Sequence, residues 1–467
     1  MSIKIAIIGA GSLGFTRCLA HDVLSVAELR DTEFALYDIN EKNMTRVAAI
    51  LRRDVRANKL KAKITCHTDP KKAFGQADYV LNCARVGGLD AFALDVEIPL
   101  KYGIDQCVGD TLCAGGIMYG QRGIAAMLGW CDVIREVAKP NVLLLNYGNP
   151  NAMMTWAANV FGGVPCIGLC HGVHGGHWQI SSVIQLLVNG KRKEGDKGFV
   201  PVEVKDVDII CAGINHQTWY IQALYKGEDW CSRLLEGFQK HPTFSQTEKV
   251  RIDILKRFGY YSTESNGHLS EYVPWYRKRS KEETAKWIKL GCWIDGETGG
   301  YLRVCKEGRD DFDKTHKEIL SGKPWDLATD ARSHEHGSWI IEALETGRMY
   351  RGHFNVINNG AISNLSDDAI VEVPGYVDRN GVSIPSIGDL PMGCAAICQQ
   401  SVNVQRLAVH AAVAGDRELL TQAMLLDPLT AAVCTPPEIE SMVGDFLKAQ
   451  AQWLPQYNKI QSKSKRK

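Results

Sequence analysis

The glycine motif at the start of the chain constrains its fold more than any other feature. The apolar run KIAII at residues 4–8 leads directly into Gly9, Gly11 and Gly14, which have the spacing G-x-G-x-x-G. A strand that is buried on both faces has such a composition, and the glycines permit a tight turn into a helix. We therefore predict that the chain begins with a strand, a turn and a helix of the Rossmann type.

The segments after this motif favour a dinucleotide site. A helical pattern covers 15–29, and the strand-like run TEFALYDI that follows contains Asp38, close to the spacing expected of an acid that binds a ribose. The pyrophosphate would lie over Gly11 and Ser12, where the N–H groups of a helix start favour an anion. An Asp at this strand end favours NAD over NADP. The alternative is an ordinary turn followed by a surface Asp.

Strand-like and helix-like segments continue to alternate as far as residue 165. Further strand-like runs stand at 63–68, 78–88 and 141–151, and the glycine-rich stretch 109–123 is expected to form a loop before a helix. This alternation predicts a doubly wound parallel sheet, whose functional side chains gather at the carboxyl ends of the strands.

Polar residues at these strand ends are candidates for substrate binding or catalysis. Asp110 lies in the glycine-rich stretch, and Asn149 and Asn151 follow the strand-like run NVLLLNY. Parallel strands bring their carboxyl ends to one edge of the sheet, so we expect these three side chains near the nucleotide site.

The chain is long enough for more than one domain. We predict a Rossmann domain over residues 1–165, a mixed α+β domain over 166–455 and a basic, disordered tail over 456–467. In the second domain, NNG and RNG indicate turns between strands, and 395–427 has the apolar spacing of two helices. The expected fold class is therefore α/β, a doubly wound parallel sheet joined to a second α+β domain, as in lactate and malate dehydrogenases.

The composition disfavours several classes of partner and location. The 54 basic and 53 acidic residues nearly cancel, whereas a nucleic-acid or anionic-membrane partner needs a concentrated positive field. No apolar stretch of the sequence is long enough to span a bilayer, and the N-terminal apolar run leads into a glycine turn instead of a signal-peptide layout. Fifteen cysteines without repeated spacing do not indicate a disulfide framework. We expect a soluble, reduced, cytoplasmic protein.

The stretch GLCHGVHGGHW concentrates one cysteine and three histidines. A structural zinc site would need four soft ligands in paired spacing, and this stretch has no such pairs. Adjacent strand residues point to opposite faces, which disfavours a local dyad of Cys170 and His171. What remains is an open metal site that combines Cys170 with His216, which ends another apolar run, VDIICAGINH.

Several segments together resemble glycoside hydrolase family 4. They are spread in order over almost the whole chain: GAGS, DTLCAGGI, NYGNPNAMMTW, GLCHGV, CAGINH, STESNGHLSEYVPWY, IVEVPGYVD, LPMGCAA and LDPLTAA. Among the branches of the family, the similarity is greatest to bacterial α-galactosidases of the melibiase type. The Cys-Asp-Met-Pro and Cys-Asn-x-Pro signatures of the phospho-sugar branch are absent. The chain departs from the melibiase pattern at Gly172, where Ser is usual, and in the stretch LCAGG.

The resemblance implies a mechanism unlike that of the two-carboxylate glycosidases. NAD⁺ takes a hydride from C3 of the sugar, a base removes the acidified C2 proton, and the glycosidic oxygen leaves by elimination. Water then adds, and the hydride is returned. A divalent ion on the C2 and C3 oxygens would stabilise the charge that develops there. The implied cofactors are NAD and Mn²⁺, the implied partner is a glycoside or oligosaccharide, and a homodimer or homotetramer is expected.

The resemblance also assigns roles to residues around the metal. Cys170 and His216 match the ligands of the Mn²⁺ ion. Tyr272 matches the base that removes the C2 proton, a role for which a nearby cation must lower its pKa. The alternative for Tyr272 is an aromatic anchor in the cleft wall. His171 is the candidate acid for the leaving oxygen.

Three further residues are assigned to the sugar. Asn149 matches an asparagine that contacts sugar hydroxyls, and Asn151 is predicted to bind substrate beside it. Asp110 matches an acidic position next to the reacting groups and is predicted to be catalytic.

Other functions remain open. Within the same family, the substrate is alternatively an α-glucoside or a glucuronide or galacturonide. A 2-hydroxy-acid dehydrogenase would use Arg85 or Arg122 to clamp a carboxylate, but it would leave Cys170 and His216 without a role. A non-catalytic nucleotide sensor is the third possibility, and activity on any nitrophenyl glycoside would exclude it.

Overall fold

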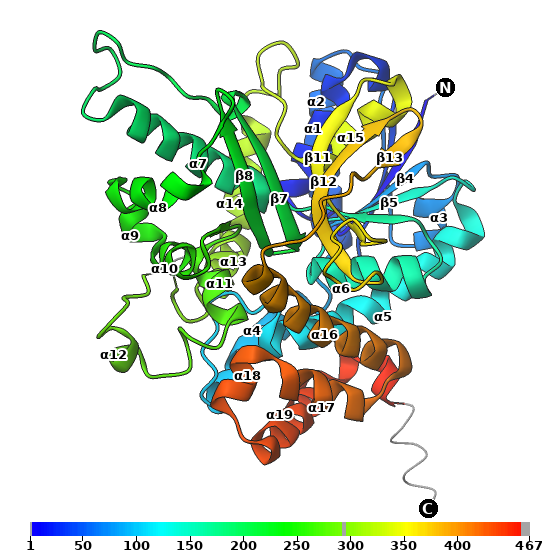
Figure 1. The fold of residues 1–467 in the computed structure, drawn as a ribbon. Coiled ribbons are helices and arrows are strands. Elements are labelled where there is room, and N and C mark those ends of the chain that lie inside the picture. Colours follow the sequence, from blue (N-terminus) through cyan, green and yellow to red (C-terminus); the bar gives the residue numbers. More distant parts are fainter. Residues whose placement is uncertain (1, 292–295, 459–467) are drawn as a thin grey trace, which may run out of the picture.

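A single mixed sheet forms the centre of the structure, a computed structural model that describes residues 2–291 and 296–458 (Figure 1). Its strands are β1 (Lys4–Ile8), β2 (Glu33–Tyr37), β3 (Lys63–His67), β4 (Tyr79–Asn82), β5 (Leu143–Asn146), β6 (Cys166–Gly168), β7 (Val207–Ile214), β8 (Gln217–Tyr225), β9 (Glu228–Asp229), β10 (Tyr261–Ser262), β11 (Tyr350–Ile357), β12 (Ile370–Asp378) and β13 (Gly381–Ser383). The strand order is β10-β8-β7-β12-β11-β6-β5-β4-β1-β2-β3, with β13 paired to β12 and β9 to β8.

The strands from β3 to β6 make a parallel half with the order β3-β2-β1-β4-β5-β6. This order is typical of a Rossmann fold. In β1, Ile5 and Ile7 belong to one apolar core and Ala6 and Ile8 to another, and all four are buried. Burial on both faces explains why the run is apolar without a break. The predicted Rossmann fold is confirmed.

The antiparallel half continues the same sheet. Strand β6 pairs in parallel with β5 on one side and antiparallel with β11 on the other, through Gly168 and Asn355. Strands β12, β7, β8 and β10 follow, all antiparallel. The hairpin of β12 and β13 turns at Arg379 and Asn380, as the motif RNG predicts. The sheet therefore runs without a break past residue 165, where the sequence predicts the end of the first domain.

Helices cover both faces of the sheet (Figure 1). They are α1 (Phe15–Ser25), α2 (Glu41–Ala57), α3 (Pro70–Phe74), α4 (Gly88–Lys101), α5 (Cys113–Val137), α6 (Asn151–Trp156), α7 (Gly172–Asn189), α8 (Cys231–Lys240), α9 (Phe244–Thr247), α10 (Lys249–Phe258), α11 (Asn266–Tyr272), α12 (Lys281–Thr284), α13 (Gly300–Asp310), α14 (Phe312–Ser321), α15 (His336–Thr346), α16 (Met392–Ala414), α17 (Arg417–Leu426), α18 (Pro428–Val433) and α19 (Pro436–Ala449). Helices α16 and α17 confirm the two helices predicted over 395–427, and α16 packs against α5.

The prediction of a loop over 109–123 is wrong for most of that stretch, because α5 begins within it. A β-carbon at Gly115 would lie 2.5 Å from the carbonyl oxygen of Asp95, and one at Gly116 would lie 2.4 Å from the backbone of Thr111. These glycines therefore permit the close approach of backbone segments inside the fold and do not mark a flexible connection.

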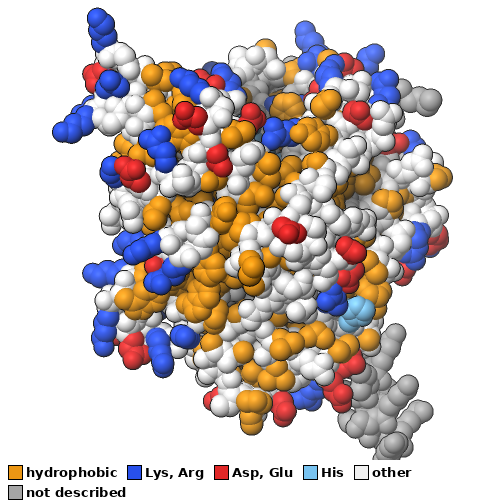
Figure 2. All heavy atoms as spheres, in the orientation of Figure 1, with side chains coloured by type: hydrophobic (Ala, Val, Ile, Leu, Met, Phe, Trp, Pro, Cys, Tyr) orange, Lys and Arg blue, Asp and Glu red, His pale blue; other side chains and the backbone are white. Residues whose placement is uncertain are grey.

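The surface and the cysteines agree with the composition. In Figure 2, Lys and Arg side chains alternate with Asp and Glu around the margin of the face shown, and hydrophobic side chains gather across its centre. Within residues 2–291 and 296–458, no helix has the length and apolarity that a membrane crossing requires. The cysteines of these ranges are all unpaired.

The predicted tail over 456–467 is described only as far as residue 458. Its first residues are packed and hydrogen-bonded. The Tyr457 hydroxyl donates to Oε1 of Gln121 at 2.6 Å, and the Gln456 amide donates to the Gln121 carbonyl oxygen at 2.9 Å. The start of this segment is thus fixed to α5, and the remaining residues of the predicted tail lie outside the described part of the chain.

Candidate active site

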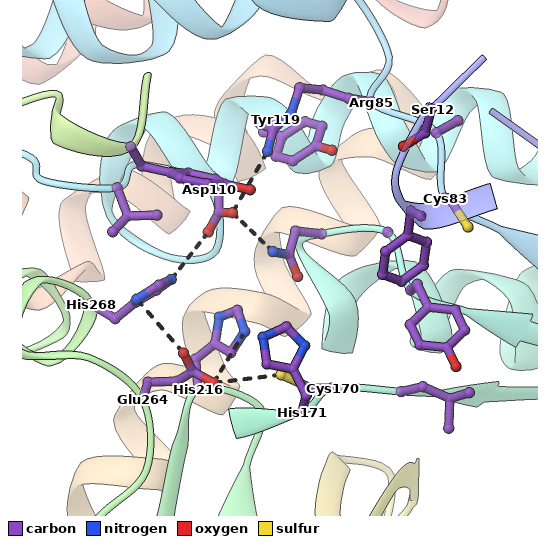
Figure 3. A pocket seen from close by; sticks show the side chains of 18 residues that line it. Ser12, Cys83, Arg85, Asp110, Tyr119, Cys170, His171, His216, Glu264 and His268 are labelled. Carbon is purple, nitrogen blue, oxygen red and sulfur yellow. Dashed lines mark hydrogen bonds and ion pairs between the residues drawn. The ribbon is translucent and has the colours of Figure 1, made fainter. Parts of the chain in front are cut away.

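A pocket of about 430 Å³ opens at the carboxyl ends of the central parallel strands (Figure 3). Strand β1 lies between β2 and β4, so the chain winds in opposite directions from this point, and open sheets bind ligands at such a switch point. The lining residues that matter below are Ser12, Arg85, Asp110, Asn149, Cys170, His171, His216, Glu264 and His268. They come from segments that follow β1, β4, β5, β6 and β7, from the segment before α5, and from the start of α11.

The glycine turn after β1 forms one wall of this region. Gly9 has φ +81°, and a β-carbon there would lie 2.7 Å from Cα of Ala84. The Gly11 N–H donates to Oδ2 of Asp38 at 2.7 Å, so the turn and the predicted ribose-binding acid are fixed to each other. Nothing lies within 4 Å of where a β-carbon on Gly14 would stand, which leaves the start of α1 open. An open helix start of this kind suits an anion.

Cys170 and His216, which the sequence predicts as metal ligands, lie together in the pocket with Glu264. Cys170 follows β6, His216 follows β7, and Glu264 precedes α11. Oε1 of Glu264 lies 3.5 Å from Sγ of Cys170 and 3.8 Å from Nε2 of His216. One ligand atom from each residue lies within 4.8 Å of the other two. Sulfur, nitrogen and oxygen donors at this spacing suit a divalent transition-metal ion.

Glu264 and Cys170 differ in their protonation. Burial raises the pKa of the Glu264 carboxyl, but the neighbouring histidines, His216 foremost, outweigh it and hold this pKa at about 2. Burial and the charge of Glu264 raise the pKa of the Cys170 thiol well above its usual range. An ionised carboxylate therefore accepts a hydrogen bond from a protonated thiol here, and a bound cation would displace that proton.

The hydroxyl of Thr111 determines which nitrogen of His216 is free. It lies 2.8 Å from Nδ1 of His216 and donates to Oδ1 of Asp110 at 2.8 Å. Burial raises the pKa of the Asp110 carboxyl, but the charges of His268, His216 and Arg85 outweigh burial, and the net shift is downward. The carboxylate is therefore ionised and can only accept hydrogen bonds. The Thr111 hydroxyl has one proton, which it donates to Asp110. Toward His216 the same hydroxyl oxygen must therefore accept a hydrogen bond from Nδ1–H. Nε2 of His216 is left with its lone pair toward Glu264.

A second group of side chains surrounds Asp110. Its Oδ2 accepts from the Asn149 amide at 2.9 Å and lies 3.9 Å from Nη2 of Arg85. His268 stands between the two acids, with Nε2 3.9 Å from Oδ1 of Asp110 and Nδ1 3.8 Å from Oε2 of Glu264 (Figure 3). Burial lowers the pKa of the His268 imidazole, which bridges the two carboxylates.

Two of the residues predicted to bind or act on the sugar do not line the pocket. Tyr272 is 1% exposed, its ring centre lies 6.0 Å from that of His268, and burial raises its pKa well above the usual range. Asn151 donates from its amide to the backbone carbonyl oxygens of Asn146 and Leu169, both at 3.0 Å. Tyr272 therefore stands one layer behind the pocket wall, and Asn151 ties the ends of β5 and β6 together.

The remaining predicted residues divide between the rim and the interior. The His171 side chain is 73% exposed at the rim, with Nδ1 3.7 Å from Oε1 of Glu335. Of the two arginines that a dehydrogenase would use, Arg122 is unexposed and paired with Asp95 through contacts of 2.6 and 2.8 Å. Only Arg85 of these two lies on the pocket.

Glu264 and His268 were not predicted from the sequence. They stand four residues apart in STESNGH, on either side of Ser265, whose Oγ accepts from the His268 N–H at 3.3 Å and caps α11. An acid and a histidine that are four residues apart at the start of a helix point to the same side of that helix. This spacing is the sequence signal that predicts Glu264 and His268 as a pair. In the sequence, STESNGHLSEYVPWY contributes to the family resemblance, and that resemblance assigns a role to Tyr272 alone.

Comparisons with known proteins identify the family. Residues 4–186 match the family described as family 4 glycosyl hydrolase, and residues 211–430 match the family 4 glycosyl hydrolase C-terminal domain. The chain is 54% identical to an α-galactosidase of Rhizobium meliloti, over 98% of this chain and 90% of that protein. It is 32% identical to an α-galactosidase of Bacillus subtilis, over 97% of this chain and 99% of that protein.

A solved structure shares the fold. The 6-phospho-α-glucosidase from gut microorganisms in complex with NAD and glucose-6-phosphate superposes with a TM-score of 0.77 at 26% identity, over 97% of this chain and 99% of that chain. Two family matches and a relative that is 54% identical over nearly the full length leave one assignment. The chain belongs to family 4 of the glycosyl hydrolases, as its motifs predict.

Proposed function

We propose that this chain hydrolyses α-galactosides of the melibiose and raffinose type, with NAD⁺ and Mn²⁺ as cofactors. The observation that carries the proposal is the position of Cys170 and His216, which meet at the switch-point pocket next to the glycine turn. A metal site and a dinucleotide site side by side suit a hydrolase that uses redox chemistry. The relative that is 54% identical, an α-galactosidase, supports the substrate class.

The residues of the glycine turn fit NAD. Gly11, Ser12 and Gly14 would hold the pyrophosphate at the open start of α1, and Asp38 would bind the ribose. Gly9 and Gly11 have no room for a β-carbon: one at Gly11 would lie 2.9 Å from Oδ2 of Asp38. When bound, NAD⁺ supplies a reversible hydride acceptor.

Cys170 and His216 fit a divalent metal. They come from strands that are separated in the sheet by β11 and β12, and the Thr111 hydroxyl leaves Nε2 of His216 free to bind. When bound, a divalent ion polarises sugar oxygens and offsets negative charge. Two such ligands leave positions for substrate oxygens and water, as an open catalytic site requires.

The chain's own residues would orient the sugar and move protons. Asp110 fixes the amide of Asn149 at 2.9 Å, which directs the amide oxygen of Asn149 away to accept from a sugar hydroxyl. His171, which is exposed at the rim, would give a proton to the departing oxygen. Asn151 acts through the backbone of the strand ends. The role of Tyr272 as the base stays a prediction, because it stands behind His268.

One observation favours a second substrate, an α-galacturonide. The Arg85 guanidinium lies 4.4 Å from the ring centre of Phe92 and 4.9 Å from that of Tyr119, and its Nη1 is buried with no hydrogen-bond partner among the described residues. A guanidinium held in this way can bind a carboxylate through two parallel hydrogen bonds. A uronate in the pocket would present one.

A substrate panel tests the proposal. The purified chain would be assayed on nitrophenyl α-galactoside, α-glucoside, α-galacturonide and β-galactoside with Mn²⁺, NAD⁺ and a thiol reductant. We expect the highest kcat/KM on the α-galactoside, loss of activity with a chelator or without NAD⁺, and no net NADH. A higher kcat/KM on the α-galacturonide would show that the uronate, and not the α-galactoside, is the substrate. Stoichiometric NADH from a hydroxy acid, without glycoside cleavage, would contradict the proposal.

We also propose a cytoplasmic homo-oligomer, a dimer or a tetramer. The unpaired cysteines suit a reducing compartment. The hydrophobic side chains across the centre of the face in Figure 2, and Met392 at the start of α16, which is 88% exposed, suit contact with a second copy. Light scattering that gives the mass of a single chain would contradict the oligomer.

A further inference from the structure

The carboxylate of Glu264 lies between Cys170 and His216, the two residues proposed to hold the metal. Its Oε1 is 3.5 Å from the sulfur and 3.8 Å from Nε2, and the three ligand atoms lie within 4.8 Å of one another. Bonds from a transition metal to sulfur, nitrogen and oxygen are about 2.0–2.3 Å long. A triangle of this size therefore has room for one ion at its centre, in contact with all three donors.

The backbone places two of these donors at some cost. His216 has φ +63° and Glu264 has φ +66°. Residues with side chains avoid this left-handed region, and strained conformations persist where the fold over-determines them, often at functional sites. Two such residues, from the ends of different segments, direct their side chains at the same point. This agreement is independent of the distances between the donors.

Gly172 provides the space that the Glu264 carboxylate occupies. A β-carbon at Gly172 would lie 1.8 Å from Oε1 of Glu264 and 2.8 Å from its carboxyl carbon. Gly172 has no positive φ, so its backbone would accept other residues. The absence of a side chain at this position, two residues after Cys170, is therefore required by Glu264 and not by the turn into α7.

We propose that Glu264 is a third protein ligand of the metal, and that Gly172 is needed to admit it. A thiolate, a carboxylate and a neutral imidazole together carry the charge that balances a divalent ion. The inference rests on the proposed metal role of Cys170 and His216. It adds a fixed acidic ligand that makes the site more selective for divalent over monovalent cations.

Titration with Mn²⁺ alone tests this without turnover. The full chain, with NAD⁺ and a thiol reductant but no sugar, would be titrated while free Mn²⁺ is followed by electron paramagnetic resonance. Glu264→Gln keeps the side-chain size and should weaken Mn²⁺ binding by at least about tenfold, the loss typical even of outer partners of a metal site. Gly172→Ala should weaken it comparably. Gly175→Ala, on the same helix with nothing within 4 Å, should leave it unchanged.

A double-mutant cycle separates the steric role of Gly172 from a general effect on α7. In a Glu264→Ala background there is no carboxylate to displace, so Gly172→Ala should cause no further loss. Wild-type affinity in Glu264→Gln, or an equal cost of Gly172→Ala in both backgrounds, would overturn the inference. Absence of Mn²⁺ binding by the wild type, or full affinity in Cys170→Ser, would instead overturn the proposed metal function and this inference with it.

Discussion

Replacing Thr111 with valine removes the hydroxyl between Asp110 and His216 but keeps the shape of the side chain. In the wild type this hydroxyl accepts from Nδ1–H of His216 at 2.8 Å, which keeps Nε2 free for a metal. Without it, the imidazole proton is better placed on Nε2, which faces the negative carboxylate of Glu264 at 3.8 Å. Metal binding must then move that proton back to Nδ1, which has lost its acceptor.

The size of the effect follows from the burial of the histidine. His216 is 5% exposed, so Nδ1–H in the metal-bound variant has little access to water. An unsatisfied buried donor costs about 1–3 kcal/mol, and each 1.4 kcal/mol is a factor of ten in affinity. Thr111→Val should therefore weaken Mn²⁺ binding by about 5- to 140-fold.

Mn²⁺ titration of the full chain measures this, with kcat/KM on an α-galactoside as a second reading. Thr111→Ser keeps the hydroxyl and is the matched control, for which we expect a change of no more than about threefold. The reasoning about the His216 tautomer is refuted if Thr111→Val binds Mn²⁺ as tightly as the wild type, or if Thr111→Ser loses as much as Thr111→Val.

Three other perturbations test separate parts of the structure. Asp38→Ala should raise the NAD⁺ concentration needed for half-maximal activity by about tenfold or more and leave Mn²⁺ affinity unchanged; unaltered NAD⁺ dependence would argue against the ribose site. Asp95→Ala leaves the buried Arg122 guanidinium without its paired carboxylate, and urea denaturation should show a loss of about 3–5 kcal/mol in the free energy of unfolding, whereas a loss under about 1 kcal/mol would contradict this. Burial raises the pKa of Glu372 to about 8, so between about pH 4.5 and 8 the folded chain keeps a proton that the unfolded chain has lost. The free energy of unfolding of the wild type should therefore fall as pH rises through this window. Relative to the wild type, the free energy of unfolding of metal-free Glu372→Gln should rise by about 2–4 kcal/mol between pH 5 and 8. Parallel pH profiles of the two proteins would contradict this.

The first strand, the glycine turn and Asp38 could be predicted because their signals are local. A strand buried on both faces must be apolar throughout, and Gly9 must lack a side chain because a β-carbon there would lie 2.7 Å from Cα of Ala84. Cys170 and His216 could be predicted in the same way, since each closes an apolar run at the edge of the sheet. Local patterns were therefore enough to predict the Rossmann half and the position of Cys170 and His216 at the pocket.

The rest depends on contacts between distant segments. Strands β11 and β12, from residues 350–378, lie between β6 and β7, and no pattern around Cys170 or His216 indicates this. The arrival of Glu264 beside them, and the position of Tyr272 behind the wall, follow from that pairing and from the packing of α11. The glycines before and within α5 predict a loop where the structure has mostly helix, because a glycine marks either a flexible loop or a close backbone contact and the sequence does not distinguish the two.

The most direct test of the proposed mechanism is the fate of the hydrogen at C2 of the sugar. The chain would hydrolyse an α-galactoside in D₂O with Mn²⁺ and NAD⁺, and nuclear magnetic resonance would measure deuterium in the released galactose. Removal of the C2 proton predicts deuterium at C2, whereas a hydrolase with two carboxylates leaves that hydrogen in place. Tyr272→Phe should suppress exchange together with turnover; full exchange in this variant would reassign the base only. Complete hydrolysis by the wild type with no deuterium at C2 would contradict the mechanism itself.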